Sequence, residues 1–282
     1  MESERSSPFR RLSFDFSVRC DVPEAAEYVL RVLGRFAVSE PGTDGVTYEV
    51  LDDGSTADGS RYRLLRNGEW MVGSDDPAAV IDDLFARVNV DTVKVTRDLV
   101  LVHAGAVATP AGIGMLLPAS AGSGKSTLVA GLVRAGFGYL SDEAAVLDPK
   151  TGMLHAYPVH LSLKAASRDR FPEALPRPAD LALSGGMWHV DPDVIRSGAV
   201  ASSCEVGFVI SHRYDPDAEA TVEPITAAQA CTTLTMNLML ARRDAARSLD
   251  LLAEICRASQ SYRLVRGDVE AAVEAIVELT EA

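Results

Sequence analysis

The pattern of apolar and polar positions in the first part of the chain predicts a small α+β module. Residues 12–20 alternate as in a strand with one buried face. Residues 23–34 have the spacing of an amphipathic helix that Asp21 introduces. The elements predicted next are two short strands and a helix, over 46–51, 61–66 and about 77–90. We expect residues 1–95 to form this module, which contains no recognisable chemistry.

From Asp98 onward the chain changes to longer apolar runs. The elements predicted there are two strands, a helix and a third strand, over 99–109, 115–120, 127–135 and 139–141. Residues 150–200 are rich in proline and are predicted to be mostly loops. A strand over 206–211 and a run of helices close the chain, the last helix over 269–279. Such alternation is typical of an α/β domain, which we assign to residues 96–282.

A glycine-rich loop lies between the second of these strands and the helix. Residues 119–126 follow the Walker A pattern G-x-x-x-x-G-K-S/T, with Ala119 in place of the first glycine. Glycines let backbone N–H groups turn toward an anion, and the next helix presents its N-terminus to it. Lys125 is expected to reach the outer phosphates of a nucleotide, and the Ser126 hydroxyl to bind Mg²⁺. The residues predicted to bind the nucleotide are Ala121, Gly122, Ser123, Gly124, Lys125, Ser126 and Thr127.

Two acidic residues, Asp142 and Glu143, follow the strand after this helix. The spacing puts the Asp142 carboxylate at the carboxyl end of a strand beside the loop. A carboxylate there can hold Mg²⁺ through water, orient an attacking group or take a proton from a hydroxyl. An acidic pair at a strand end is also typical of a surface helix N-cap. We expect Asp142 to be catalytic, and Glu143 to join Ser126 as a metal ligand.

Charge and cysteine content argue against several classes of function. The chain of 282 residues has a formal net charge of −13 and a pI near 4.8, so its long-range field repels nucleic-acid phosphates. Its four cysteines lie far apart without a C-x-x-C motif, which predicts free thiols. No secretory signal and no apolar run of spanning length is evident. We therefore expect a cytoplasmic protein that binds neither nucleic acid nor membrane.

Motif order separates the chain from two large groups of nucleotide-binding proteins. The stretch L-S-G-G-M at 183–187 resembles the signature of ABC transporter ATPases, but there the signature precedes the acidic pair, whereas here Asp142 comes first. The guanine-reading motif N-K-x-D of small GTPases is missing from the sequence. Two functions stay open on the residues alone: phosphoryl transfer to an acceptor, and a nucleotide-binding regulatory ATPase without an acceptor.

The order of motifs resembles that of HPr kinase/phosphorylase and its shorter kinase relatives. The resemblance is carried by a histidine strand and glycine loop over 99–127, by G-F-G-Y-L-S-D-E-A-A-V-L over 136–147, and by A-Y-P-V-H-L-S-L-K over 156–164. It extends over residues 98–282, with further similar stretches toward the C-terminus. It implies a P-loop kinase core of the phosphoenolpyruvate-carboxykinase-like type. Such an enzyme would use ATP and Mg²⁺ to phosphorylate a serine or a similar hydroxyl.

The resemblance also implies roles for single residues. By position, Asp142 matches the acid–base residue that accepts the hydroxyl proton, and His103 matches the histidine near it; a lone histidine on a strand is otherwise more often a core residue. Lys125 and a second cation would stabilise the transferring group. The residues considered for further charged roles are Lys164, Asp191 and Arg213. We expect the second cation and the acceptor site within the loop-rich residues 150–215.

The acceptor itself is not fixed by the sequence. The chain lacks the downstream glycine-rich signature of the long enzymes that act on HPr, so HPr is not expected to be the substrate. The shorter relatives resemble kinases that tailor serine residues of ribosomal peptides, while others act on free serine or other small hydroxyl compounds. The expected partner is therefore a hydroxyl-bearing peptide or small molecule, and a homo-oligomer, as among the long enzymes, stays open.

Overall fold

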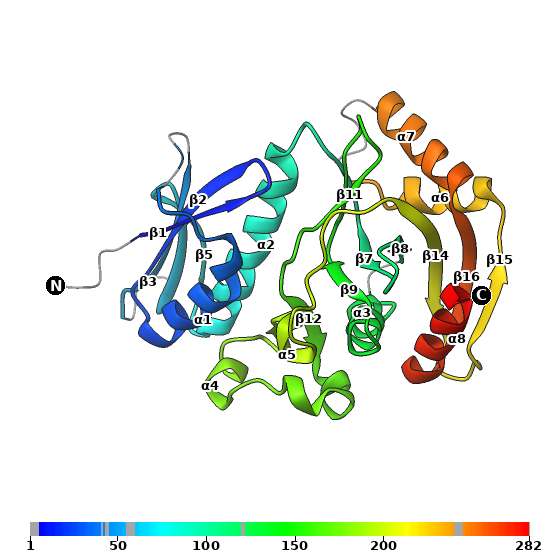
Figure 1. Cartoon of the computed structure of the whole chain (residues 1–282). Coiled ribbons are helices and arrows are strands. Elements are labelled where there is room, and N and C mark those ends of the chain that lie inside the picture. The colour runs from blue at the N-terminus through cyan, green and yellow to red at the C-terminus, as the bar shows by residue number, and fades with distance from the viewer. Residues whose placement is uncertain are drawn as a thin grey trace. The chain divides into compact units, whose positions relative to one another are not determined.

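A computed structural model of the chain gives a mixed α/β protein (Figure 1). The residues that it describes are 6–40, 42, 45–54, 60–119, 122–239 and 245–281. They divide into two compact units. The first unit lies within residues 1–96, 164–168 and 175–190, and the second within 97–163, 169–174 and 191–282. Two segments from the middle of the chain thus belong with the N-terminal part.

The first unit is built on a sheet with strand order β1-β2-β3-β4-β5. Its strands are β1 (Ser7–Arg11), β2 (Phe14–Cys20), β3 (Val46–Asp52), β4 (Tyr62–Arg66) and β5 (Glu69–Ser74). Strands β2 and β3 are parallel, because α1 (Pro23–Leu33) and the 3-10 turn Gly34–Phe36 connect them, while the other neighbours are antiparallel. Helix α2 (Pro77–Val95) follows β5 and begins at Asp76, whose side chain accepts a hydrogen bond from the Ala78 amide.

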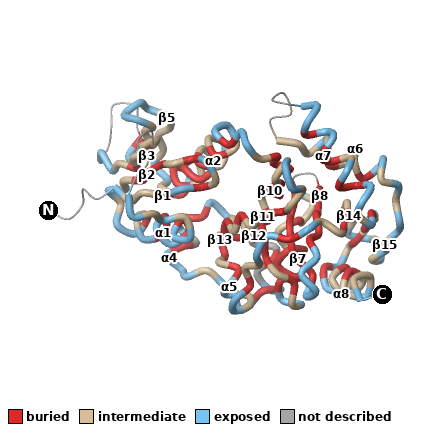
Figure 2. The backbone as a smooth tube through the Cα atoms, turned by 45° about the horizontal axis from the view of Figure 1, so that its top comes forward, coloured by how far each residue is buried: buried red, intermediate tan, exposed pale blue. Residues whose placement is uncertain are grey.

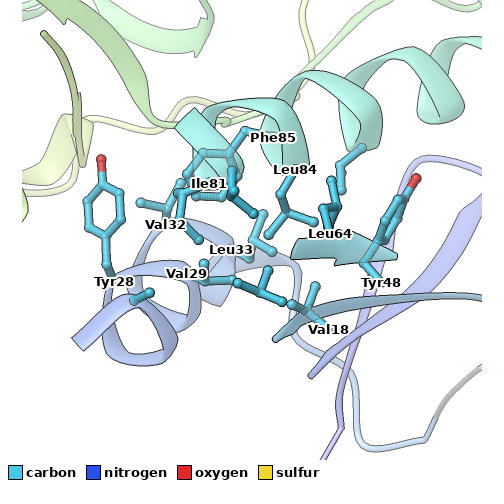
Figure 3. Packing of buried hydrophobic residues seen from close by; sticks show 14 of the residues in the cluster. Val18, Tyr28, Val29, Val32, Leu33, Tyr48, Leu64, Ile81, Leu84 and Phe85 are labelled. Atoms are coloured by element: carbon cyan, nitrogen blue, oxygen red, sulfur yellow. The ribbon is translucent and has the colours of Figure 1, made fainter. Parts of the chain in front are cut away.

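Apolar side chains from both helices and one face of the sheet form the core of this unit. Figure 3 shows Tyr28, Val29, Val32 and Leu33 of α1 next to Ile81, Leu84 and Phe85 of α2. The alternation in β2 predicted this face, because Phe14, Phe16 and Val18 are its buried residues. Two short elements complete the unit, α4 (Pro178–Leu181) and β13 (Met187–Val190). They are held to α1 by hydrogen bonds of 2.8 Å between Tyr28 and His189 and 2.6 Å between Arg31 and Asp180.

The second unit contains a sheet with strand order β15-β16-β14-β8-β7-β9. Its strands are β7 (Ala104–Ala108), β8 (Gly114–Pro118), β9 (Gly138–Ser141), β14 (Val206–Tyr214), β15 (Thr221–Pro224) and β16 (Gln260–Arg266). Strands β8, β14 and β16 are parallel to each other, and the remaining neighbours pair antiparallel. The carboxyl ends of three parallel strands therefore meet at one edge, which is where ligands bind in open α/β sheets.

Helices cover this sheet on two faces (Figure 1). Helices α3 (Lys125–Arg134) and α8 (Val269–Glu281) pack together, as do α6 (Ala227–Met236) and α7 (Ala245–Ala258). Strand β7 separates the pairs: Ala104 and Ala106 face the apolar cluster of α6 and α7, whereas the Cα of Gly105 faces α3. Figure 2 shows β7 and β8 as buried segments, in agreement with their continuous apolar sequence.

The chain contains further short strands and helical turns outside the two large sheets. Strands β6 (Val100–Val102), β10 (Ala145–Leu147) and β11 (Leu154–His155) form a separate sheet. The proline-rich region contains β12 (Leu161–Lys164), α5 (Pro192–Ile195) and 3-10 turns over Ala165–Arg170 and Pro172–Ala174. Within the described part of the chain, no helix combines the length and apolar character that crossing a membrane requires.

Among the sequence predictions that differ from the structure are two in the second unit. The apolar run 99–109 is not one strand, because it breaks at His103 into β6 and β7, which belong to different sheets. The His103 amide donates instead to the Asn237 carbonyl at 2.8 Å, outside either ladder. The chain also does not close with helices alone, since β15 and β16 join the sheet there. By contrast, the helix after the glycine loop is confirmed and begins at Lys125, slightly earlier than predicted.

Candidate functional site

The glycine loop connects β8 to α3 at the carboxyl edge of the sheet. Gly122 and Gly124 have φ angles of +80° and +78°, a backbone region that glycine adopts without strain. Gly124 is the N-cap of α3 and has no side chain that could cap the first turn. Helix N-termini without such a cap are typical binding places for anions. Ala121 of the predicted nucleotide site lies outside the described residues.

Lys125 begins α3, and its side chain is buried. Its Nζ lies 2.8 Å from Nε2 of His103, at the break between β6 and β7. Burial lowers the pKa of Lys125, and the charges of Glu143 and Asp142 oppose this shift. Burial and the Lys125 charge also lower the pKa of His103, although a hydrogen bond with the Glu143 backbone opposes the change. A neutral His103 therefore accepts a hydrogen bond from the Lys125 ammonium group.

Asp142 follows β9, and its side chain is fully enclosed. One carboxylate oxygen lies 3.0 Å from the Tyr139 hydroxyl, and the other accepts a hydrogen bond of 3.1 Å from the Ser162 amide. The carboxylate also hydrogen-bonds the side chain of Ser126, the residue after Lys125. Burial raises the pKa of Asp142, against the lowering effect of its hydrogen bonds with Ser126 and Ser162. The carboxyl group is thus held rigidly and is easier to protonate than an exposed aspartate.

The Tyr139 hydroxyl lies between the Asp142 carboxyl group and a second acceptor. The Tyr139 hydroxyl is also 2.7 Å from the Val159 carbonyl, which can only accept. Since a phenol has one hydrogen, it satisfies both oxygens fully only when the Asp142 carboxyl supplies a proton of its own. The hydrogen bonds around Asp142 are therefore compatible with a protonated carboxyl group.

The residues predicted to hold a metal lie beside this carboxylate. Ser126 offers its hydroxyl to Asp142, and Glu143 is half-buried and close enough for its charge to raise the pKa of both Asp142 and Lys125. No cluster of three or more His, Cys, Asp or Glu side chains suited to a metal occurs among the described residues. A hydroxyl and two carboxylates nevertheless fit Mg²⁺, which keeps several waters and takes phosphate oxygens as ligands.

Two buried residues that the sequence analysis did not single out lie against the glycine loop. Arg266, the last residue of β16, donates from Nη2 to the Gly124 carbonyl at 2.9 Å and lies 3.4 Å from that of Ser123. His212, near the end of β14, has Nε2 3.3 Å from the Ser123 hydroxyl. Burial, with the charges of Arg266 and Lys125, lowers the pKa of His212 to about 3. Both residues come from carboxyl ends of parallel strands, and only their position in a strand could have indicated them.

The other charged candidates have different surroundings. Arg213 is exposed and pairs with Asp215 at 3.3 Å, and Lys164 belongs to the first unit. Asp191 caps α5 by accepting from the Asp193 amide at 2.9 Å. Thr127, predicted to bind the nucleotide, is half-buried in the first turn of α3.

The chain has only weak similarity to the known proteins with which it was compared. No protein-family model matches the chain, and no curated protein matches it. Among solved structures, it is similar to the Hpr(Ser) kinase/phosphatase from Coxiella burnetii, with 16% sequence identity and a TM-score of 0.30. The similarity covers 64% of this chain and 92% of the other. A structural similarity this weak carries no functional conclusion.

Proposed function

We propose that the protein is a kinase that uses ATP and Mg²⁺ to phosphorylate a serine or a similar hydroxyl. The observation that carries this proposal is the buried Asp142 carboxyl, hydrogen-bonded to Ser126 directly beside the Lys125–His103 pair. A loop that binds phosphates is enough for a nucleotide-binding protein. A rigid carboxyl that can take up a proton beside that loop is what a kinase needs in addition.

The glycine loop and Lys125 would bind the phosphates. The amide groups at the start of α3 and the Lys125 ammonium group would face the β- and γ-phosphates of ATP. His103 keeps the lysine in place, because it accepts one of its three hydrogens and leaves the others for phosphate oxygens. Ser126 and Glu143 would hold Mg²⁺, which would supply positive charge to the transferring group.

Asp142 would act as the general base. Its carboxylate takes the proton of the acceptor hydroxyl while that oxygen forms a bond to the γ-phosphorus. The bond from the γ-phosphorus to the bridging oxygen breaks, and ADP leaves with the electron pair. Tyr139 and the Ser162 amide hold the carboxylate through this step, so that it enters the reaction already oriented.

The resemblance of residues 98–282 to HPr-kinase-related sequences supports the acceptor class. It favours a hydroxyl on a peptide, a protein or a small molecule, including a precursor peptide in natural-product tailoring. The expected binding region is the loop-rich segment after β11, which supplies the Ser162 amide to Asp142.

Transfer of label from γ-labelled ATP tests the proposal. The protein is incubated with Mg²⁺ and a panel of free serine, small hydroxyl metabolites and serine-containing peptides. Label that moves to one acceptor, and does not move with Asp142→Asn, supports the kinase. Label released only as inorganic phosphate, at a rate that no acceptor changes, would overturn it in favour of a regulatory ATPase.

A further inference from the structure

The buried side chain of Arg266 donates hydrogen bonds to the backbone of the glycine loop. This arginine belongs to neither the Walker A motif nor the acidic pair. Arg266 is 3% exposed and ends β16, whose neighbour β14 lies beside β8, the strand that leads into the loop (Figure 1). Among the described residues of the loop, its guanidinium group hydrogen-bonds the backbone carbonyls of Gly124 and Ser123. These two contacts are thus made with the main chain of the loop.

The hydrogen bonds from Arg266 affect the orientation of the N–H groups in the loop. A peptide group points its carbonyl and its N–H in opposite directions, so a donor that binds the carbonyls on one side turns the amides toward the other. Gly124 makes this approach possible, since a Cβ there would lie 2.4 Å from Nη2 of Arg266. The Gly124 carbonyl also accepts from the Leu128 amide at 3.0 Å, which ties the same group to the first turn of α3.

The charge of Arg266 is incompletely compensated. Among the described residues it forms no ion pair, and its Nε, although buried, has no hydrogen-bond partner there. The nearest acidic residues along the chain, Asp268 and Glu270, are exposed and pair with Arg170 at 3.2 Å and 2.6 Å. His212 beside it is a buried imidazole whose Nδ1 likewise has no partner within the described residues. The charges of Asp268 and Glu270 act on Arg266 without a direct ion pair. A buried cation that lacks a direct ion pair is costly, and an anion bound nearby offsets that cost.

We propose that Arg266 is a positioning residue for the phosphates. It holds the Ser123–Gly124 and Gly124–Lys125 peptide groups in the orientation that points their N–H groups at the ligand, and its charge is balanced by the bound polyphosphate. This inference rests on the proposed nucleotide binding but not on the transfer step or on Asp142. The ligand class is a polyphosphate, as the free anion or as part of a nucleotide.

Affinity for ATP, AMP and inorganic tripolyphosphate, measured by calorimetry with Mg²⁺, tests the inference. Arg266→Gln is expected to lose about 10- to 100-fold in affinity for ATP and tripolyphosphate, as for removal of a charged hydrogen-bonding group. The loss should be smaller for AMP, which carries fewer phosphates. Arg266→Lys keeps the charge without the planar fork and should recover part of the affinity.

The matched control is Arg213→Gln on the neighbouring strand. Its side chain is 68% exposed and pairs with Asp215, so its removal changes net charge equally without touching the loop. Unfolding midpoints of the unliganded variants show whether each variant is folded. If Arg266→Gln does not fold, the affinities of Arg266→Lys and wild type are compared instead. Equal affinity of wild type and the Arg266 variants would overturn the inference alone. A wild-type protein that binds none of the three probes would overturn the proposed function together with it.

Discussion

The Lys125 ammonium group and the His103 imidazole are hydrogen-bonded at 2.8 Å. His103 reaches the lysine because the apolar run that contains it is interrupted there, with β6 and β7 diverging into different sheets on either side. The break turns what looked like a core histidine of a long strand into a partner of the glycine-loop lysine. A buried ammonium group without an acceptor would otherwise be destabilising.

Replacing His103 is therefore expected to destabilise the fold. His103→Leu leaves the Lys125 ammonium group without this acceptor and should lower the free energy of unfolding by about 1–3 kcal/mol. His103→Gln offers a carbonyl oxygen in a similar position and should cost less. Urea unfolding followed by circular dichroism measures both. Equal stability of His103→Leu and wild type would show that the hydrogen bond contributes nothing.

Lys125 and Asp142 should separate binding from transfer. Lys125→Ala removes the cation that faces the phosphates and is expected to weaken ATP binding and transfer together. Asp142→Asn keeps the shape of the side chain but cannot accept a proton, so transfer should fall about 10²- to 10⁴-fold while ATP binding persists. Calorimetry and single-turnover label transfer give the two quantities. An unchanged transfer rate in Asp142→Asn would falsify its assignment as the base.

His212 predicts a particular dependence of stability on pH. Its pKa is lowered to about 3 in the folded protein from an ordinary value of 6.5, so between these values the unfolded chain binds a proton that the folded chain does not. The contribution of His212 is fully present above the unfolded pKa and is lost as pH falls, by at most about 1.4 kcal/mol per pH unit.

The change attributable to His212 is the difference between two proteins. The free energy of unfolding of wild type and His212→Gln is measured by denaturant titration at several pH values from about 7 down to about 4.5, within the window where the imidazole of the unfolded chain titrates. Wild type should lose more stability than the variant over this range. Parallel curves would mean that the imidazole does not remain neutral in the fold.

Gly105 allows α3 to lie close to the sheet, because glycine has no Cβ. A Cβ at this position would lie 2.7 Å from Cγ2 of Val129 and 3.3 Å from Cγ of Lys125. Gly105→Ala should therefore shift α3 and cost about 1–3 kcal/mol of stability, as overpacking of a core does. ATP affinity should fall as well, because α3 carries Lys125.

A glycine without such contacts provides the comparison. Gly34 has a helical φ of −55°, and a Cβ added there would have no neighbouring atom within 4 Å. Gly34→Ala should therefore not destabilise the protein and should raise its stability by up to about 1 kcal/mol. Thermal unfolding of both variants, with and without ATP, measures the two effects. Equal melting temperatures for the two substitutions would contradict the predicted crowding at Gly105.

Local patterns in the sequence determined a good part of this protein. The alternation in β2, the apolar face of α1 and the glycine loop with its following helix are contained in short stretches of chain, because strand and helix periodicity depend on neighbouring residues. The same holds for the acidic pair directly after β9. Such features are predictable since the residues that form them are also the residues that signal them.

The tertiary structure alone decided which distant residues surround the loop. Arg266 contacts Gly124 from 142 residues further along the chain, and His212 contacts Ser123 across 89 residues. Neither contact has a local signal, because each depends on which strands become neighbours in the sheet and on their register. The break at His103 was hidden for the same reason: its amide bonds to Asn237, a residue far along the chain. The sequence determined the loop, its lysine and the acidic pair, and long-range pairing of β8, β14 and β16 decided what supports them.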